Sequence, residues 1–254
     1  EQMLDAYSAI GMPIFYSHWS FGKSFVYNQE MYKRGYMGLA YEIVINSNPC
    51  IAYLMEENTM TMQALVMAHA SIGHNNFFKN NHLFRQWTDA DFIIDFLDFA
   101  KYKITEYEEK YGQTEVEFVL DACHALQYHG IDRYKRPSAR TKTFEEELRR
   151  NRLKMDQENF NEIWRTVPTD QVASETKKKS TFPEEPEENL LYCVEKNAPN
   201  MPQWKREIIR IVRKISQYFY PQGLTKIMNE GWATFWHYTI MHDLYDQQLL
   251  SDGA

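Results

Sequence analysis

The chain has 254 residues, of which 44% are hydrophobic and 25% charged, proportions that are typical of a globular protein. Its formal net charge of −7 gives no reason to expect a general nucleic-acid or anionic-membrane binder. The three cysteines are far apart and form no CxxC pair, which argues against a cysteine zinc finger and a disulfide framework and favours a cytoplasmic location. No stretch reaches the ~18 apolar residues of a membrane span.

The first part of the chain predicts an aromatic loop followed by helices. Residues 12–27 are rich in aromatic side chains without a helical period, so we expect an irregular, largely buried loop there. Residues 29–46 are predicted to be helical up to the segment NSNP, because Pro49 disfavours helix in the residue before it. Residues 60–80, rich in Met, Ala and Leu, form a second helical candidate.

Two further helices are predicted from their start signals. Thr88-x-x-Asp91 resembles a helix start and precedes a helical apolar pattern. Thr114-x-x-Glu117 is a clearer capping box, and Gly130 is the expected stop of that helix.

The second half of the chain divides by composition. Residues 133–189 are charge-dense, and we expect an exposed helix at 143–165 and a linker after it. An amphipathic helix is predicted at 203–219, ended by Pro221, and a last helix at 224–248.

The predicted fold class is mainly α, with a few short strands possible but not placed. Residues 1–132 and 190–254 are expected to supply the two parts of one helical core, joined by the charged segment 133–189. The chain starts without Met and stops soon after a helical pattern, so we expect it to be a fragment of a longer protein.

His69 and His74, in the segment AHASIGH, are the first candidate metal ligands. Ligand pairs on helices are usually four residues apart, whereas a spacing of five gives about 140° around a regular α-helix and points the rings apart. A π-bulge would bring them together, and so would a helix that ends at Gly73. Without either, both are expected to be core histidines with hydrogen-bond partners.

Carboxylates in apolar surroundings supply further candidates. Glu230 lies in the apolar segment MNEGWATFWHY and is the better ligand candidate, while His237, two turns later on the same face, would support a ligand or face the substrate. Glu42 is flanked by apolar residues and is either a surface acid or a functional one. Asp121 and His124 share a helix face, which fits a structural hydrogen bond or a pair of ligands.

Several long blocks of sequence resemble the SpoVR family, the stage V sporulation protein R-like proteins. They include GMPIFYSHWSFGKSF, YEIVINSNPCIAYLMEENTMTMQALVMAHASIGHNNFFKNN, LDACHAL, RYKRP, REIIRIVRKISQYFYPQ and MNEGWATFWHY. The resemblance covers nearly the whole chain except parts of 138–185, and family members are longer. All six candidates fall inside these blocks: Glu42, His69, His74, His124, Glu230 and His237.

The resemblance implies a role in the physiology of sporulation, the cell envelope or stress. The family is named for spore cortex formation and also occurs in bacteria that make no spores, often encoded near a PrkA-type serine kinase and a von Willebrand A-like protein. Those two proteins are therefore possible partners, and a peptide or a peptidoglycan precursor is a possible substrate. No nucleic-acid partner is expected.

The segment NEGWA is also similar to the one that carries the third zinc ligand in gluzincin peptidases. That similarity makes His69, His74 and Glu230 the expected ligands of a divalent metal ion, with zinc favoured. This chain has HASIGH instead of HExxH, so the general base would come from elsewhere, and Glu42 is the candidate. His124 or His237 would stabilise the oxyanion or fix a ligand.

Three functional hypotheses follow. The first is a zinc-dependent hydrolase of amide bonds. The second is a dinuclear iron or manganese carboxylate site in a helical bundle, although no regular Glu-x-x-His pair occurs twice. The third is a non-enzymatic partner in the kinase-linked system, with the histidines satisfying a polar core.

Overall fold

We describe the protein from a computed structural model that places residues 6, 9, 11–12, 14–36, 42–134, 147, 150–151 and 188–250. Contacts divide the chain into two compact units, Glu1–Ile131 with Asn189–Ala254, and Asp132–Glu188. In the described part of the second unit, Arg133 and Glu188 form an ion pair at 3.6 Å. The helix predicted at 143–165 lies almost entirely outside the described residues, as does most of the charged segment.

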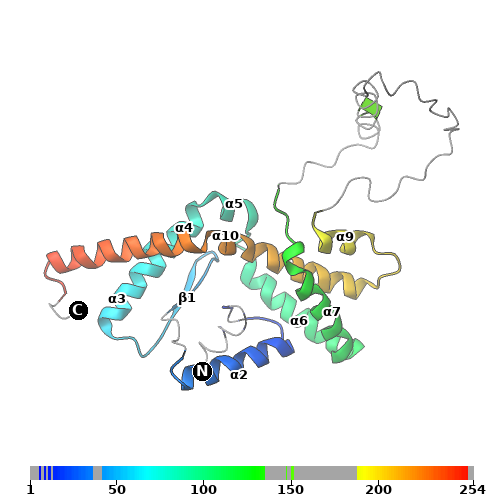
Figure 1. Ribbon diagram of the computed structural model, residues 1–254, viewed down its shortest axis with the longest axis horizontal. Coiled ribbons are helices and arrows are strands. Elements are labelled where there is room, and N and C mark those ends of the chain that lie inside the picture. Colours follow the sequence, from blue (N-terminus) through cyan, green and yellow to red (C-terminus); the bar gives the residue numbers. More distant parts are fainter. Residues whose placement is uncertain are drawn as a thin grey trace, which may run out of the picture. The chain divides into compact units, whose positions relative to one another are not determined.

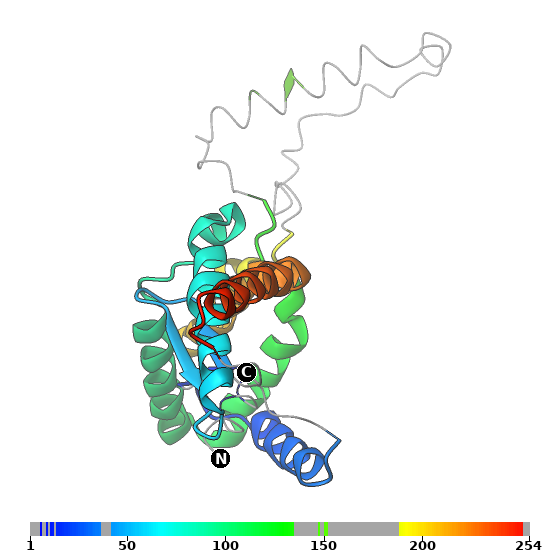
Figure 2. The same ribbon diagram turned by 90° about the vertical axis from the view of Figure 1, so that its left-hand side faces the viewer.

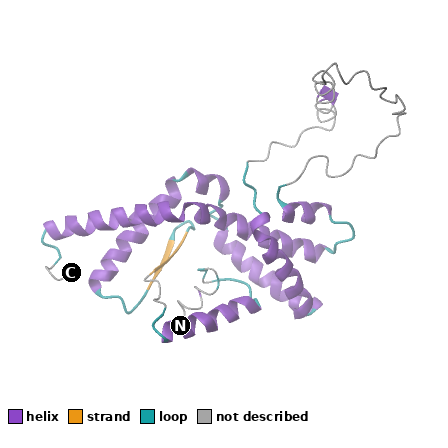
Figure 3. Ribbon diagram, viewed as in Figure 1, coloured by secondary structure: helices purple, strands orange, loops and turns teal. Residues whose placement is uncertain are grey.

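The first unit is built mainly from helices, which confirms the predicted fold class (Figures 1 and 3). The described helices are α2 (Trp19–Lys33), α3 (Met60–Ala68), α4 (Asn75–Asn80), α5 (His82–Trp87), α6 (Ile93–Tyr111), α7 (Gln113–Leu126), α9 (Leu190–Asn197) and α10 (Gln203–Asp246). A π-helical segment, η1 (His69–His74), joins α3 to α4, and a 3-10 turn, η2 (Gln127–His129), follows α7. No described helix is both long enough and apolar enough to cross a lipid bilayer.

The aromatic loop predicted at 12–27 is correct only for its first residues. Met12, Phe15 and Tyr16 are buried without regular structure, but α2 begins at Trp19. The imidazole of His18 starts this helix, because it accepts a hydrogen bond from the backbone N–H of Ser20 and so satisfies one of the free donors of the first turn.

The helix predicted at 29–46 is wrong in its second half. Helix α2 ends at Lys33, and residues 42–45 form strand β1 (Glu42–Ile45), which pairs antiparallel with β2 (Ile51–Leu54). Most of the residues in these two short segments are β-branched or aromatic, which fit a pleated strand better than a helix. The sequence offered only eight strand residues, too few for the alternation to stand out.

The helix predicted at 60–80 is confirmed, although it is not a regular α-helix throughout. Its N-terminus is capped by Thr59, whose hydroxyl accepts from the backbone N–H of Met62. Helices α3 and α4 are joined without a break through the π-helical segment η1. In both views, this combined helix crosses α10, and most of its contacts with α10 are made by η1 (Figures 1 and 2).

The two predicted helix starts are displaced, although both helices exist. Thr88 follows the end of α5, where its hydroxyl donates to the carbonyl of Phe84, and α6 begins only at Ile93. Helix α7 begins at Gln113, one residue before Thr114, because Gly112 at a φ of 91° makes the reversal between α6 and α7. The expected stop at Gly130 follows the 3-10 turn η2.

The hydrophobic core lies where α6 and α7 pack against the first half of α10. Buried apolar residues from the three helices meet there: Leu97, Ala100, Ile104, Val116, Leu120, Ile208, Ile211 and Val212. Their spacing of three and four residues puts them on one face of each helix. This core holds the first half of α10 in place, and with it the end that extends toward η1.

The predicted break at Pro221 is wrong, because α10 continues from Gln203 to Asp246. Proline removes one backbone donor from the helical ladder. Pro221 is buried, and its carbonyl accepts an added hydrogen bond from the hydroxyl of Thr225 at 2.7 Å. Packing on both sides of Pro221 therefore outweighs the local preference, and one rigid helix connects the core to the histidines of η1.

Candidate metal centre

Strand β1 delivers Glu42 to a large cavity. Successive side chains of a strand point to opposite faces, and Ile43 and Ile45 are buried in the core. Glu42 and Val44 therefore point the other way and line the cavity. Because residue 42 lies in a strand and not in a helix, the carboxylate of Glu42 reaches the cavity although its neighbours are apolar. Its side chain is only 12% exposed.

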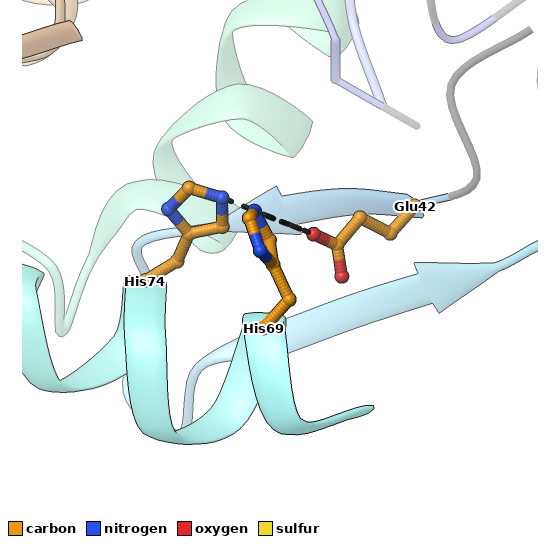
Figure 4. A group of neighbouring side chains, drawn as sticks. All are labelled: Glu42, His69 and His74. Atoms are coloured by element: carbon orange, nitrogen blue, oxygen red, sulfur yellow. Dashed lines mark ion pairs between the residues drawn. The ribbon is translucent and has the colours of Figure 1, made fainter. Parts of the chain in front are cut away.

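The π-helical segment brings His69 and His74 together. A π-turn pairs each residue with the fifth one along the chain, so a spacing of five, which diverges on an α-helix, places both rings on one side. The ring centroids are 4.6 Å apart and nearly perpendicular. Figure 4 shows both rings pointing from the same helix toward the Glu42 carboxylate. Of the two rescues considered from the sequence, the π-bulge is the one that occurs.

Gly73 lets this segment approach α10 closely. A Cβ built on Gly73 would lie 2.6 Å from the Cα of Ala233, well inside any normal contact. Ala233 is itself fully buried. The two small residues allow η1 to lie directly on α10, and this contact brings Asn229, Glu230 and His237 to the histidine pair.

Glu230 adds a second carboxylate to the group. Its Oε2 is 3.6 Å from Nε2 of His69 and 3.9 Å from Nε2 of His74. Glu42 is equally close, with its Oε1 3.5 Å and 3.8 Å from the same two nitrogens. The carboxylates differ in exposure, since the Glu230 side chain is 54% exposed and that of Glu42 only 12%. The two imidazoles are thus flanked by two carboxylates of different accessibility.

The remaining ring nitrogens have partners that fix the orientation of both imidazoles. His74 donates from Nδ1 to Oδ1 of Asn229 at 2.9 Å. Nδ1 of His69 lies 2.8 Å from Nδ1 of His237, so one of the two carries the shared proton. When that proton is on His69, both Nε2 atoms are unprotonated and face the carboxylates. Such partners on the far nitrogen are typical of histidines that bind metal ions.

Burial shifts the pKa values of this group in opposite directions. Burial, and then the charge of Glu230, raise the pKa of Glu42 to about 8. Burial, and then His74 and His237, lower the pKa of His69 to about 4. The second oxygen of Glu42, Oε2, is buried and has no hydrogen-bond partner among the described residues. A cation beside Glu42 would relieve both the desolvation and the repulsion.

The donor set fits a single divalent cation. The ligand atoms of Glu42, His69 and His74 all lie within 4.8 Å of one another, and no other such group occurs in the described part of the chain. Zinc bonds to imidazole nitrogen and carboxylate oxygen are about 2.0–2.2 Å long, so tetrahedral ligand atoms are about 3.3–3.6 Å apart. The separations of Glu42 Oε1 from the two imidazole nitrogens, 3.5 and 3.8 Å, need only a small contraction around an ion.

The group opens into a cavity of about 950 Å³. Its walls combine the ionisable side chains with apolar ones from α3 and α4, including Met62, Leu65, Val66 and Phe78. His74 also stacks on Phe78, with ring centroids 6.0 Å apart. The cavity is large enough for a small organic or peptide-like ligand to reach the imidazole nitrogens.

His124, predicted to act at the site, is not brought to this cavity. Its Nε2 lies 2.5 Å from the hydroxyl of Tyr16, and its ring packs edge-on against His18 at 4.6 Å. Asp121 accepts from Trp19 Nε1 at 2.9 Å and pairs with His18 at 3.1 Å. Both side chains of this helix face therefore contact residues 16–19. Conversely, Asn229 was not predicted, and its position next to Glu230 is the only local signal that points to it.

The chain is similar in sequence to known proteins. The family model described as "SpoVR like protein" matches residues 1–254. A relative named "Uncharacterized protein YcgB" from Escherichia coli (strain K12) is 61% identical over 247 residues, which cover 97% of this chain and 48% of the relative. The chain thus spans about half the length of that relative, and no solved structure matches it. On the full-length family match and the high identity, the chain belongs to the SpoVR family.

Proposed function

We propose that this chain is a metal-dependent hydrolase of amide bonds, in which Glu42, His69 and His74 hold a divalent cation, zinc by preference. The observation that carries the proposal is the convergence of three ligand atoms at the wall of an open cavity. The hydrogen bonds at both Nδ1 atoms support it, because they leave the Nε2 atoms aimed at the carboxylates.

The exposure of the two carboxylates favours Glu42 as the ligand and Glu230 as the general base. This exchanges the roles expected from the sequence. The Glu42 side chain is only 12% exposed. Its buried Oε2 has no hydrogen-bond partner in the described part of the chain, so it would need a cation to carry its charge. The side chain of Glu230 is half exposed and can pass a proton to solvent. A general base must reach both the reacting water and the bulk, and Glu230 meets both requirements.

The positions of these residues suggest a chemical role for each of them. When bound, a zinc ion supplies Lewis acidity, which polarises a carbonyl oxygen and makes water more acidic. Glu230 would take the proton from the attacking water and return it to the leaving amine. Asn229 and His237 would hold the two imidazoles in place through their Nδ1 atoms. The apolar wall of the cavity would limit competing water.

The substrate class proposed is a peptide or a peptide-like amide. A cavity of about 950 Å³ lies at the upper end of the range for small-molecule sites and would accept several residues of an extended chain. A peptidoglycan precursor has this chemistry, as does an ordinary peptide. The described residues contain one compact ligand group, which favours one ion over the dinuclear iron or manganese alternative.

The test is hydrolysis by metal-loaded protein. The chain would be stripped with a chelator, reloaded with zinc, manganese or ferrous iron, and assayed on N-acyl amino-acid p-nitroanilides and short peptides. We expect zinc to restore hydrolysis best. Glu230→Gln should lower kcat by about 10²- to 10⁴-fold with its zinc content unchanged, and exposed His82→Ala should match the parent. Hydrolysis that survives chelation, or that Glu230→Gln leaves intact, would overturn the proposal.

A further inference from the structure

A second cavity of about 270 Å³ adjoins the metal-centre cavity. The two cavities share three wall residues, Tyr128 on η2 and Phe219 and Gly223 on α10. The other walls of the second cavity, called here the side cavity, include Ile131 and Ile215. Ile215 belongs to the buried core, so this part of the wall is firmly held.

The side cavity has a different chemistry from the metal-centre cavity. None of the residues that line the side cavity carries a charge, whereas the larger cavity is lined by Glu42, Glu230 and Lys226. The hydroxyl of Ser216, at its wall, already donates to the carbonyl of Val212 at 2.8 Å. An uncharged apolar group therefore pays the smallest desolvation penalty there and gains the most free energy from burial. An apolar cavity of about 150 Å³ holds benzene, so this one accommodates a larger group.

Gly223 leaves the border between the two cavities open. A Cβ built on Gly223 would meet no atom within 4 Å, in contrast to Gly73, where it would collide with Ala233. Glycine inside a helix is destabilising relative to alanine, because it loses more conformational freedom on folding. Close packing against Ala233 explains why position 73 is a glycine, but packing does not explain the glycine at position 223. What the missing side chain provides is free space where the cavities meet.

The distance along α10 sets the length of a molecule that would occupy both cavities. Seven residues separate Gly223 from Glu230, a rise of about 10 Å. An extended chain covers about 3.3–3.6 Å per residue, so three or four residues, or an acyl chain of comparable length, bridge this distance.

We propose that the side cavity is a substrate-binding subsite for an apolar group carried on an extended chain about 10 Å or more from the scissile amide. This inference rests on the proposed function for the position of the scissile bond. The apolar group has two possible sources, the side chain of a peptide residue or the end of an N-acyl chain. Their shared chemistry is a flexible, uncharged link with an apolar terminus.

The test uses hydroxamates, which chelate zinc, with and without an apolar extension. Zinc-loaded protein would be titrated with acetohydroxamate, with dodecanohydroxamate and with a tetrapeptide hydroxamate that ends in phenylalanine. We expect at least one extended ligand to bind about tenfold or more tightly than acetohydroxamate, because its end is buried. Whichever arm shows the gain identifies the source of the apolar group. Equal affinity of all three would overturn the proposal.

Variants that fill the side cavity localise the effect. Gly223→Leu and Ser216→Phe should abolish the preference for the extended ligand, measured as the ratio of the two affinities in the same protein. Gly22→Leu is the matched control, because Gly22 is exposed on α2 and an added Cβ there also meets no atom. A preference that persists in both filled variants would place the apolar group elsewhere and contradict the proposal.

A second measurement separates this inference from the proposed function. Methyl NMR spectra of Ile131 and Ile215 would be recorded with decanamide, which has no chelating group. Shifts of these two methyl signals are expected whether or not zinc is present. If no hydroxamate binds but the shifts occur, the metal-dependent function fails and the apolar site remains. If the hydroxamates bind but neither methyl signal moves, the subsite fails alone.

Discussion

His69 and His237 face each other through their Nδ1 atoms at a distance of 2.8 Å. Only one proton can occupy this contact, so one ring donates and the other accepts. If His69 donates, its Nε2 is unprotonated and available beside Glu42 and Glu230. In that tautomer the contact supports the form of His69 that a cation requires, and His237, seven positions after Glu230, would act on the site without touching the ion.

The first prediction concerns this support. His237→Phe removes the acceptor behind His69, and we expect zinc affinity to fall by about 10- to 100-fold with the fold retained. The measurement is competition for zinc against a chelating dye, with circular dichroism as a check of folding. His242→Phe is the control, because His242 is exposed on the same helix and contacts Tyr238. Equal affinities in parent and His237→Phe would exclude the supporting role.

The second prediction concerns the approach of η1 to α10. Gly73→Ala places a Cβ 2.6 Å from the Cα of Ala233, so the helices must separate. We expect a loss of about 1–3 kcal/mol in the free energy of unfolding, together with weaker zinc binding. Gly223→Ala is the control and should be neutral or stabilising, since its Cβ has free space. Urea unfolding of both variants measures the difference, and an unchanged Gly73→Ala protein would refute the close contact.

The third prediction is the pH dependence of metal binding. In the metal-free protein, burial and the charge of Glu230 raise the pKa of Glu42 to about 8, so below that pH a proton competes with the cation. Zinc affinity should therefore fall, by up to about tenfold per pH unit, as the pH drops from 8 to 6. His69, whose pKa is lowered to about 4 by burial and its histidine neighbours, does not compete in this range. Affinity that stays constant between pH 6 and 8 would contradict the assignment of Glu42.

The fourth prediction concerns His124, away from the cavity. Burial, and then His18, lower the pKa of His124 to about 4, whereas the unfolded chain takes up this proton near pH 6.5. Between these values the unfolded state binds more protons, so the free energy of unfolding should fall as the pH falls from 6.5 to 4. In urea unfolding of His124→Gln, the decrease in the free energy of unfolding between pH 6.5 and 4 should be smaller by about 1–3 kcal/mol than in the parent. Exposed His129→Gln should retain it, and identical pH profiles for parent and His124→Gln would refute the prediction.

The helical class and the main helices could be predicted from the sequence because their signals are local. The helix at 203–219 follows from the periodicity of its apolar residues, and the helix at 60–80 follows from its content of Met, Ala and Leu. The continuation of α10 through Pro221 could not be predicted from the sequence, because buried contacts on both sides of the proline override its local penalty. The short strand at Glu42 was missed for a related reason: four residues are too few to establish a period.

In the candidate site, too, local signals were predicted from the sequence and tertiary contacts were not. The spacing of His69 and His74 already raised the possibility of a π-turn, but the choice between a π-turn and a helix end depends on Gly73 packing against Ala233, 160 residues later. The partners of His124 likewise come from Tyr16 and His18, more than 100 residues earlier. Residue type and local spacing therefore identified the ionisable groups, while tertiary contacts decided which of them meet.

The most direct test of a metal centre at Glu42, His69 and His74 is the metal content of the purified protein. Elemental analysis would compare the parent, Glu42→Gln, His74→Ala and the exposed control His82→Ala, all purified without chelators. We predict about one equivalent of zinc in the parent and in His82→Ala, and a large reduction in the other two. No stoichiometric divalent metal in the parent, or equal contents in all four proteins, would contradict the central claim.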